Sequence, residues 1–263
     1  IATLIQSLQS LDEEELYMDK IAKTLDINSR TVESAGPILE ALITFYGSQG
    51  RFDEALETFD SISGRIDGPC LRAILYACAQ ASPARWTDAV TILHTRDIVE
   101  GTSGPGKVDQ VALGNAIIAC CKADEFEGGL NLLQLYGAPQ RDRPNTSPSL
   151  PMVSMNSLIA ACGRGFRPDL SLALLNEMRY EYGLTPDSRS YRSAVIACNR
   201  AEHLGERIRS GRSRVDDSIL EWFDSSVKWW ECGLALLRRM QEESIRPDMQ
   251  TYSSIISACE SAG

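Results

Sequence analysis

The sequence repeats one phrase, and this repetition constrains the fold more than any other feature. Residues 184–202 read LTPDSRSYRSAVIACNRAE, and residues 245–263 read IRPDMQTYSSIISACESAG. Both copies place Pro-Asp before three polar or flexible residues, a Tyr, a small apolar run and a Cys. A phrase that recurs in this way indicates an array of structural repeats.

The clearest single unit spans residues 152–187 and contains two helix-forming stretches separated by a break rich in Gly and Pro. In the second stretch Leu172, Leu175 and Met178 recur three residues apart, which is typical of one face of a helix. Pro-Asp at 186–187 then opens the next unit. The unit is therefore predicted to be a helical hairpin.

Similar hairpins are predicted along the rest of the chain, at residues 41–62, 71–93 and 114–133, with a longer one at 188–248. The array is expected to span residues 36–263 with about five and a half repeats. A single hairpin cannot bury both of its faces, so the units are expected to stack into an all-α solenoid with a concave surface. Residues 1–35 are expected to form a helical cap or a divergent half-repeat.

Five of the eight cysteines fall at one place in these hairpins, near the end of a small apolar run. They are Cys78, Cys120, Cys162, Cys198 and Cys259. The chain has no Cys-x-x-Cys motif, so metal binding is not expected. The recurring position predicts buried packing residues in a reducing compartment.

The composition of the chain makes some classes of protein less expected than others. The formal net charge of −10 is not typical of nucleic-acid-binding proteins, although a groove can be locally basic on an acidic body. No apolar run of about 18 residues is present, so no transmembrane helix is expected.

The chain starts at Ile1 without a cationic and apolar leader, and it stops inside a repeated phrase. We therefore expect it to be part of a longer protein.

The unit VSMNSLIAACGRG…LSLALLNEM…GLTPD resembles a pentatricopeptide repeat, and YSSIISACESAG, RFDEALETF and WECGLALLRRM…IRPD are similar to parts of that repeat. The tetratricopeptide repeat has a similar period but lacks the recurrent Pro-Asp. The resemblance covers about residues 36–263, with the clearest units ending at Asp187 and Asp248.

The resemblance implies a right-handed α-solenoid of stacked helix-turn-helix repeats that binds single-stranded RNA along its concave face, in the mitochondrion or the chloroplast. It implies a role in RNA processing, stability or translation. In this family the fifth and last residues of a repeat read one base edge, and an aliphatic second residue packs on the base. No cofactor, metal, membrane or small-molecule substrate is implied.

One repeat fits this pattern well. Asn156 would be its fifth residue, Asp187 its last residue and Val153 its base-packing residue, a combination that favours uracil in the family. In the next repeat Arg192 would pair with Asp248, and Arg189 replaces the aliphatic residue.

The other repeats depart further from the pattern. Arg72 with Asp109, Glu40 in the first repeat and Ser253 in the last are the corresponding residues. In the third repeat the register is open, and either Gly114 or Asn115 would be the fifth residue. Long sequence-specific recognition by this array alone is therefore not expected.

Three basic residues occupy matching places late in the first helices of successive repeats: Lys122, Arg164 and Arg200. A solenoid would align them in a row, which is suited to a phosphate chain. The alternative is that they lie near helix C-termini because cations are favourable there.

Other motifs do not support catalysis. Residues 101–107, GTSGPGK, imitate a phosphate-binding loop, but Val108 follows where a Ser or Thr would bind magnesium. His94 and His203 lack a neighbouring nucleophile or metal-ligand pattern in the sequence. No catalytic residue is therefore assigned, and the chain is not expected to be an enzyme.

The longer repeat carries an insertion at residues 202–229. Its first part, residues 205–214, holds four Arg with Gly and Ser, and is expected to be a mobile loop or a basic arm that contacts RNA or a partner. The second part carries apolar residues at helical spacing from Ile219 to Met240, with Asp216 as a candidate N-cap. It predicts a second helix of about twice the usual length, with Trp222 and Trp229 free to dock a protein partner.

Two other functions remain open. A protein-binding scaffold, such as a subunit of an organellar ribosome or complex, is favoured by the acidic charge and the degenerate fifth residues. The second alternative is that the chain is the RNA-binding arm of a larger enzyme, such as a protein-only RNase P.

Overall fold

The computed structural model describes residues 36–61, 68–100, 108–137, 150–211 and 223–262. Within these residues the chain forms eleven α-helices and no strand. Their bounds are α3 Gly36–Ser48, α4 Phe52–Asp60, α5 Gly68–Gln80, α6 Trp86–Glu100, α7 Gln110–Lys122, α8 Phe126–Tyr136, α9 Met152–Arg164, α10 Pro168–Tyr180, α11 Ser188–Arg209, α13 Trp229–Glu242 and α14 Met249–Ala262. The cap expected in residues 1–35, the imitation phosphate loop and Asp216, Ile219 and Trp222 lie outside the described residues.

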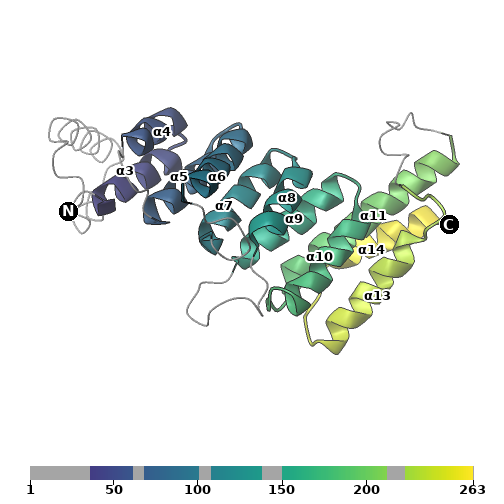
Figure 1. Cartoon of the computed structure of the whole chain (residues 1–263). Coiled ribbons are helices and arrows are strands. Elements are labelled where there is room, and N and C mark those ends of the chain that lie inside the picture. Colours follow the sequence, from purple (N-terminus) through teal and green to yellow (C-terminus); the bar gives the residue numbers. More distant parts are fainter. Residues whose placement is uncertain (1–35, 62–67, 101–107, 138–149, 212–222, 263) are drawn as a thin grey trace.

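The helices form an elongated array of antiparallel pairs, with α3 at one end and α14 at the other (Figure 1). The first helices of the pairs contact one another in succession, in the order α3, α5, α7, α9, α11 and α14. Each second helix packs against the first helix of its own pair. This two-layered stack confirms the predicted α-solenoid, because each pair buries its apolar faces on its neighbours.

Small residues allow the first helices to approach closely. A Cβ atom added to Gly47 would lie 2.6 Å from the Cβ of Ala77, and one added to Gly163 would lie 2.8 Å from the Cβ of Ala197. In each case the Gly is the twelfth residue of its helix and the Ala is the tenth residue of the next first helix. A larger side chain at either glycine would push the two helices apart.

The recurrent cysteine is the eleventh residue of its helix. Cys78, Cys120, Cys162 and Cys198 are buried, and Cys259 is half-buried. All of the cysteines are free thiols. Burial raises the pKa of Cys78 and Cys162 to about 12, so these thiols stay protonated at neutral pH. The predicted role as packing residues is confirmed.

The predicted double-length second helix is wrong. α13 begins at Trp229 and has 14 residues, whereas the first helix of the same pair, α11, has 22 residues. The extension therefore belongs to α11, and residues 205–209, which were expected in a loop, are helical.

Local contacts explain why residues 223–228 are not helical. The Asp224 carboxylate accepts the Ser226 backbone N–H, a turn that competes with a helix. Phe223 is buried in a small cluster with Ala201 and Leu204. The chain therefore turns back onto α11 before α13 starts.

Trp229 does not project from the array. Its side chain is half-buried and packs against both the main core and the cluster that contains Phe223. It therefore fills the junction between the extended end of α11 and the rest of the solenoid. No described helix is both long enough and apolar enough to cross a membrane.

Candidate nucleic-acid interface

The first helices share one register, which fixes the fifth residue of each repeat. Counting from the first helical residue, the fifth residues are Glu40, Arg72, Gly114, Asn156, Arg192 and Ser253. The residue before the next first helix closes the repeat, and these closing residues are Asp109, Pro151, Asp187 and Asp248. In the four repeats whose closing residue is described, the stacking of the repeats brings the fifth residue against the closing residue.

Asn156 and Asp187 meet as the pattern requires. The Asn156 Nδ2 atom lies 3.3 Å from Asp187 Oδ1, across the gap between α9 and α11. Ser190 completes the group, because its hydroxyl lies 2.7 Å from Asn156 Oδ1 and 2.9 Å from Asp187 Oδ1. The same Ser190 forms a capping box with Asp187 at the start of α11.

The Asp187 carboxylate stays ionised and keeps one oxygen for a further partner. Burial pushes its pKa upward, but hydrogen bonds from Ser190 and Asn156 outweigh that effect and lower the pKa below its usual range. The hydrogen bonds from Ser190 and Asn156 all end on Oδ1. Oδ2 is therefore the acceptor that this pair presents.

Val153 is the second residue of the same helix, and 59% of its surface is exposed. An exposed β-branched side chain three residues before Asn156 forms an apolar platform next to the polar pair. Val153, Asn156 and Asp187 thus lie at one edge of the array.

Two other repeats carry an ion pair at the same place. Arg72 Nη1 lies 2.6 Å from Asp109 Oδ2, and Arg192 Nη1 lies 2.8 Å from Asp248 Oδ2. The second oxygen of each aspartate caps the following helix: Asp109 Oδ1 accepts from Val111 N, and Asp248 Oδ1 accepts from Thr251. Both oxygens are therefore occupied in these two repeats.

The third repeat has no polar pair among its described residues. Gly114 is its fifth residue, and a Cβ atom there would lie 2.8 Å from Pro151, its closing residue. Asn115 is turned toward the preceding repeat, where its Nδ2 donates to the Arg72 carbonyl oxygen at 3.1 Å. Counted from the start of α7 at Gln110, Gly114 is the fifth residue and Asn115 is the sixth.

Ser253 occupies the fifth position of α14 and is exposed. Its hydroxyl donates to the Gln250 carbonyl oxygen within the same helix. Arg189, the second residue of α11, is exposed as well and stands where Val153 stands in the preceding repeat.

The expected basic row is aligned, but two of its members are bound to neighbouring helices. Lys122 Nζ donates to the Ala79 carbonyl oxygen at 2.7 Å, and Arg164 donates to the Cys121 carbonyl oxygen. Each cation thus satisfies a carbonyl at the C-terminal end of the preceding first helix, the position that the macrodipole favours. Arg200 is exposed and forms no hydrogen bond with another described residue.

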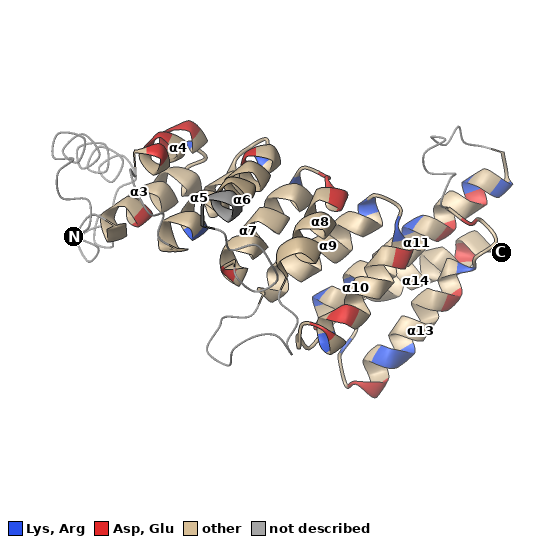
Figure 2. Cartoon of the chain, viewed as in Figure 1, with Lys and Arg blue, Asp and Glu red and all other residues tan. Residues whose placement is uncertain are grey.

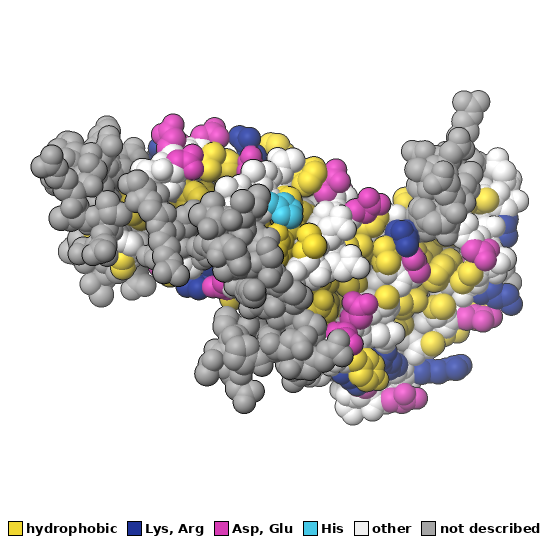
Figure 3. All heavy atoms as spheres, viewed as in Figure 1, with side chains coloured by type: hydrophobic (Ala, Val, Ile, Leu, Met, Phe, Trp, Pro, Cys, Tyr) yellow, Lys and Arg dark blue, Asp and Glu magenta, His cyan; other side chains and the backbone are white. Residues whose placement is uncertain are grey.

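Charges are distributed unevenly over the array (Figure 2). Acidic residues predominate on α4, whereas Arg residues outnumber acidic residues on α11. On the face drawn in Figure 3, the described Lys and Arg side chains stand apart, with acidic and apolar side chains between them. This face carries no continuous basic surface among its described residues.

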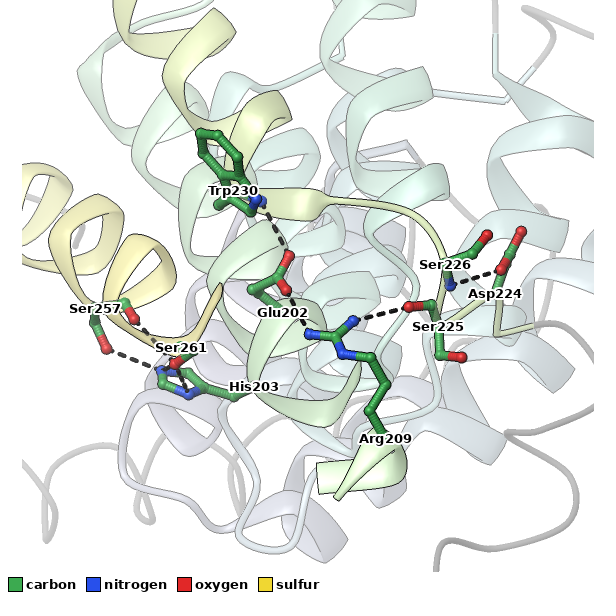
Figure 4. Close-up of polar contacts among 9 residues, drawn as sticks. All are labelled: Glu202, His203, Arg209, Asp224, Ser225, Ser226, Trp230, Ser257 and Ser261. Atoms are coloured by element: carbon green, nitrogen blue, oxygen red, sulfur yellow. Dashed lines mark hydrogen bonds and ion pairs between the residues drawn. The ribbon is translucent and has the colours of Figure 1, made fainter. Parts of the chain in front are cut away.

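The insertion holds a polar cluster that sequence reasoning missed (Figure 4). Glu202 is only 2% exposed, and its carboxylate accepts from Arg209 Nη2 at 3.0 Å and from Trp230 N at 3.2 Å. Arg209 also donates to the Ser225 carbonyl oxygen. The cluster fastens the extended end of α11 to the start of α13. In sequence Glu202 reads as a solvated helix residue, so no local signal marks it.

The two histidines, isolated in sequence, have polar neighbours in space. His203 Nε2 lies 2.9 Å from Ser257 Oγ, and Nδ1 lies 2.6 Å from Ser261 Oγ (Figure 4). His94 Nδ1 lies 2.8 Å from the Tyr136 hydroxyl. These hydrogen bonds join α11 to α14 and α6 to α8. Among the described residues, no group of three or more His, Cys, Asp or Glu side chains is arranged to hold a metal ion.

Two curated proteins of Arabidopsis thaliana are similar to this chain. Pentatricopeptide repeat-containing protein At4g20770 is 29% identical over 175 residues, which cover 61% of this chain and 22% of that protein. Pentatricopeptide repeat-containing protein At1g14470 is 28% identical over 116 residues, which cover 42% of this chain and 21% of that protein. The chain thus spans about a fifth of the length of these relatives.

A solved structure of the pentatricopeptide repeat protein PPR10, in complex with an 18-nt psaJ RNA element, aligns with 97% of this chain and 42% of that chain. The identity is 14% and the TM-score is 0.34. The family model for the PPR repeat matches residues 40–65 and 153–181, which overlap the first and fourth helix pairs. The chain thus carries two matches to the PPR repeat, and part of it is similar to pentatricopeptide repeat-containing proteins.

Proposed function

We propose that this protein binds single-stranded RNA along the concave face of the solenoid, with the fifth and closing residues of its repeats against the bases. It acts in RNA processing, stability or translation in the mitochondrion or the chloroplast. The family, the named relatives and the register of the first helices support this proposal.

The observation that carries the proposal is the group formed by Asn156, Asp187 and Val153. The Asn amide and the free carboxylate oxygen together present a donor and an acceptor, which is what the edge of an unstacked base requires. Uracil offers an N3–H donor flanked by carbonyl oxygens, so it matches Asp187 Oδ2 and Asn156 Nδ2. The exposed Val153 side chain provides the apolar surface on which the base packs.

The experiment measures binding of a labelled single strand that carries one uracil in an adenine background. At low salt we expect Asn156→Ala to weaken binding of this strand roughly tenfold, because one base contact is worth about 1–1.5 kcal/mol. Binding of the all-adenine strand should change little.

Asn131→Ala is the matched control, since Asn131 is exposed on the second helix α8, away from the fifth and closing residues. Affinity of the wild type should also fall with added salt, because phosphate contacts release counterions. Absence of binding at low salt would contradict the proposal.

That negative result would favour a protein-binding scaffold. The net charge of −10 favours this second function, because an acidic surface repels phosphates.

A further inference from the structure

We propose that the second and fifth repeats recognise guanine, and that Arg72 and Arg192 are the residues that contact it. This inference deepens the proposed RNA binding and rests on it. The Arg–Asp pairs occupy the same positions in their repeats as Asn156 and Asp187, but they differ from that pair in the hydrogen-bonding groups that they offer.

Both carboxylate oxygens of each aspartate in these pairs already accept hydrogen bonds within the protein. Asp248 Oδ2 accepts from Arg192 Nη1, and Oδ1 accepts from the Thr251 backbone and hydroxyl. Asp109 is occupied in the same way, by Arg72 and by the first N–H groups of α7. The ion pair also neutralises a carboxylate that would otherwise repel RNA phosphates.

Each arginine uses only part of its guanidinium in the ion pair. The contact to Asp uses Nη1, and neither Nε nor Nη2 forms a hydrogen bond with a described residue. These two nitrogens form one edge of the planar fork, with parallel N–H groups. The side chains are 37% exposed for Arg72 and 31% exposed for Arg192, so this edge is within reach of a ligand.

The free edge of each arginine carries only hydrogen-bond donors, so it selects a base edge that carries only acceptors. The O6 and N7 atoms of guanine lie side by side without a neighbouring donor, and a bidentate Arg contact to them is the commonest specific contact in nucleic-acid recognition. Adenine and uracil alternate donors with acceptors along their edges. Cytosine offers N3 and O2, but its amino group lies beside them and would find no free acceptor in the pair.

The order of the repeats then defines a target. The third repeat presents Gly114 and Pro151, which have no polar side chain, and the fourth presents the uracil-type pair of Asn156 and Asp187. With one nucleotide for each repeat, the expected pattern is guanine, any base, uracil and guanine, read in one direction along the strand.

The test measures equilibrium binding to adenine-rich strands that contain GAUG or its reverse, GUAG. Replacing the guanine that faces the fifth repeat by adenine should weaken binding roughly 5- to 100-fold. Replacing it by 7-deazaguanine, which lacks N7, should weaken binding as well. Inosine keeps O6 and N7, so it should bind like guanine.

Three variants test whether the guanine preference depends on Arg192. Arg192→Lys retains the charge and the partner Asp248 but lacks the planar fork, so it should weaken the guanine preference, and Arg192→Met, which has no donor, should abolish it. Arg192→Asn creates the same pair as Asn156 with Asp187, so it should change the preference at this position from guanine to uracil. Arg238→Lys on the exposed surface of α13 is the control, and circular dichroism checks that each variant folds.

The outcomes separate the two proposals. If no strand binds at low salt, RNA binding itself is wrong. If uracil strands bind in a manner that depends on Asn156, but guanine, 7-deazaguanine and adenine bind equally at the fifth repeat, this inference alone is overturned. Retention of the guanine preference by Arg192→Met, or a preference for cytosine, would overturn it equally.

Discussion

At the scale of single residues, the chemistry of the array depends on which oxygen of each closing aspartate is occupied. Asp187 keeps Oδ2 for a ligand, whereas both carboxylate oxygens of Asp109 and of Asp248 accept hydrogen bonds within the protein. The sequence predicts the positions of Asp187 and Asp248, because the Pro-Asp phrase marks these two joints, whereas Asp109 follows Val108 and lacks that signal. It does not predict the occupancy, which depends on side chains from helices that are distant in sequence.

Asp187 also contributes to stability as an N-cap, and this contribution depends on pH. We expect Asp187→Ala to lower the free energy of unfolding by about 0.5–2 kcal/mol at pH 7. Its folded-state pKa is lowered, so the stabilising effect is present above the unfolded pKa of about 3.9 and is lost as the pH falls through the folded value.

Urea denaturation at pH 7 and at pH 3 checks this prediction. The difference between wild type and Asp187→Ala should shrink at the lower pH. Asp60→Ala, at the exposed end of α4, is the control and should change stability by less than about 0.5 kcal/mol. An equal loss at both pH values would show that the carboxylate charge is not involved.

At the scale of helices, the hairpins follow from the sequence because apolar periodicity and Gly-Pro breaks agree. The insertion is the exception. The apolar spacing continues through residues 223–228, but the Asp224 turn and the burial of Phe223 against α11 stop the helix there. The buried Glu202 that holds this arrangement lies on a helix whose periodicity gives no sign of it. Periodicity therefore predicted the existence of the helices better than their lengths.

Substitutions at the eighth residue of the first helices test how the repeats stack. Ile159 is fully buried between α9 and its neighbours, whereas Ile256, its equivalent on α14, is 57% exposed. Ile159→Ala should lower the free energy of unfolding by about 2–5 kcal/mol, because it removes buried methyl groups and leaves a cavity.

Ile256→Ala is the matched substitution at the exposed equivalent and should cost less than about 1 kcal/mol. Urea titrations followed by circular dichroism measure both changes. Similar losses for the two variants would mean that the face of α14 with Ile256 is covered in solution.

At the scale of the whole molecule, a chain with a formal net charge of −10 carries a polar pair at three of the described joints between its repeats. The recurring phrase, together with apolar periodicity and Gly-Pro breaks, predicts the fold class, and the structure confirms the solenoid. Lys122, Arg164 and Arg200 are each the thirteenth residue of a first helix, but Lys122 and Arg164 also donate to carbonyl groups of the preceding first helices. The proposed phosphate contacts would therefore depend on fewer free cations than the sequence suggests.

The most direct test of the central proposal is to locate the RNA on the protein. A single strand with one 4-thiouridine in an adenine background is bound, irradiated and mapped by mass spectrometry to the linked peptide. We predict crosslinks in α9, at the peptide that contains Val153 and Asn156, and their loss in Asn156→Ala. Crosslinks confined to the second helices, or none at low salt, would contradict the assignment of this edge as the RNA-binding surface.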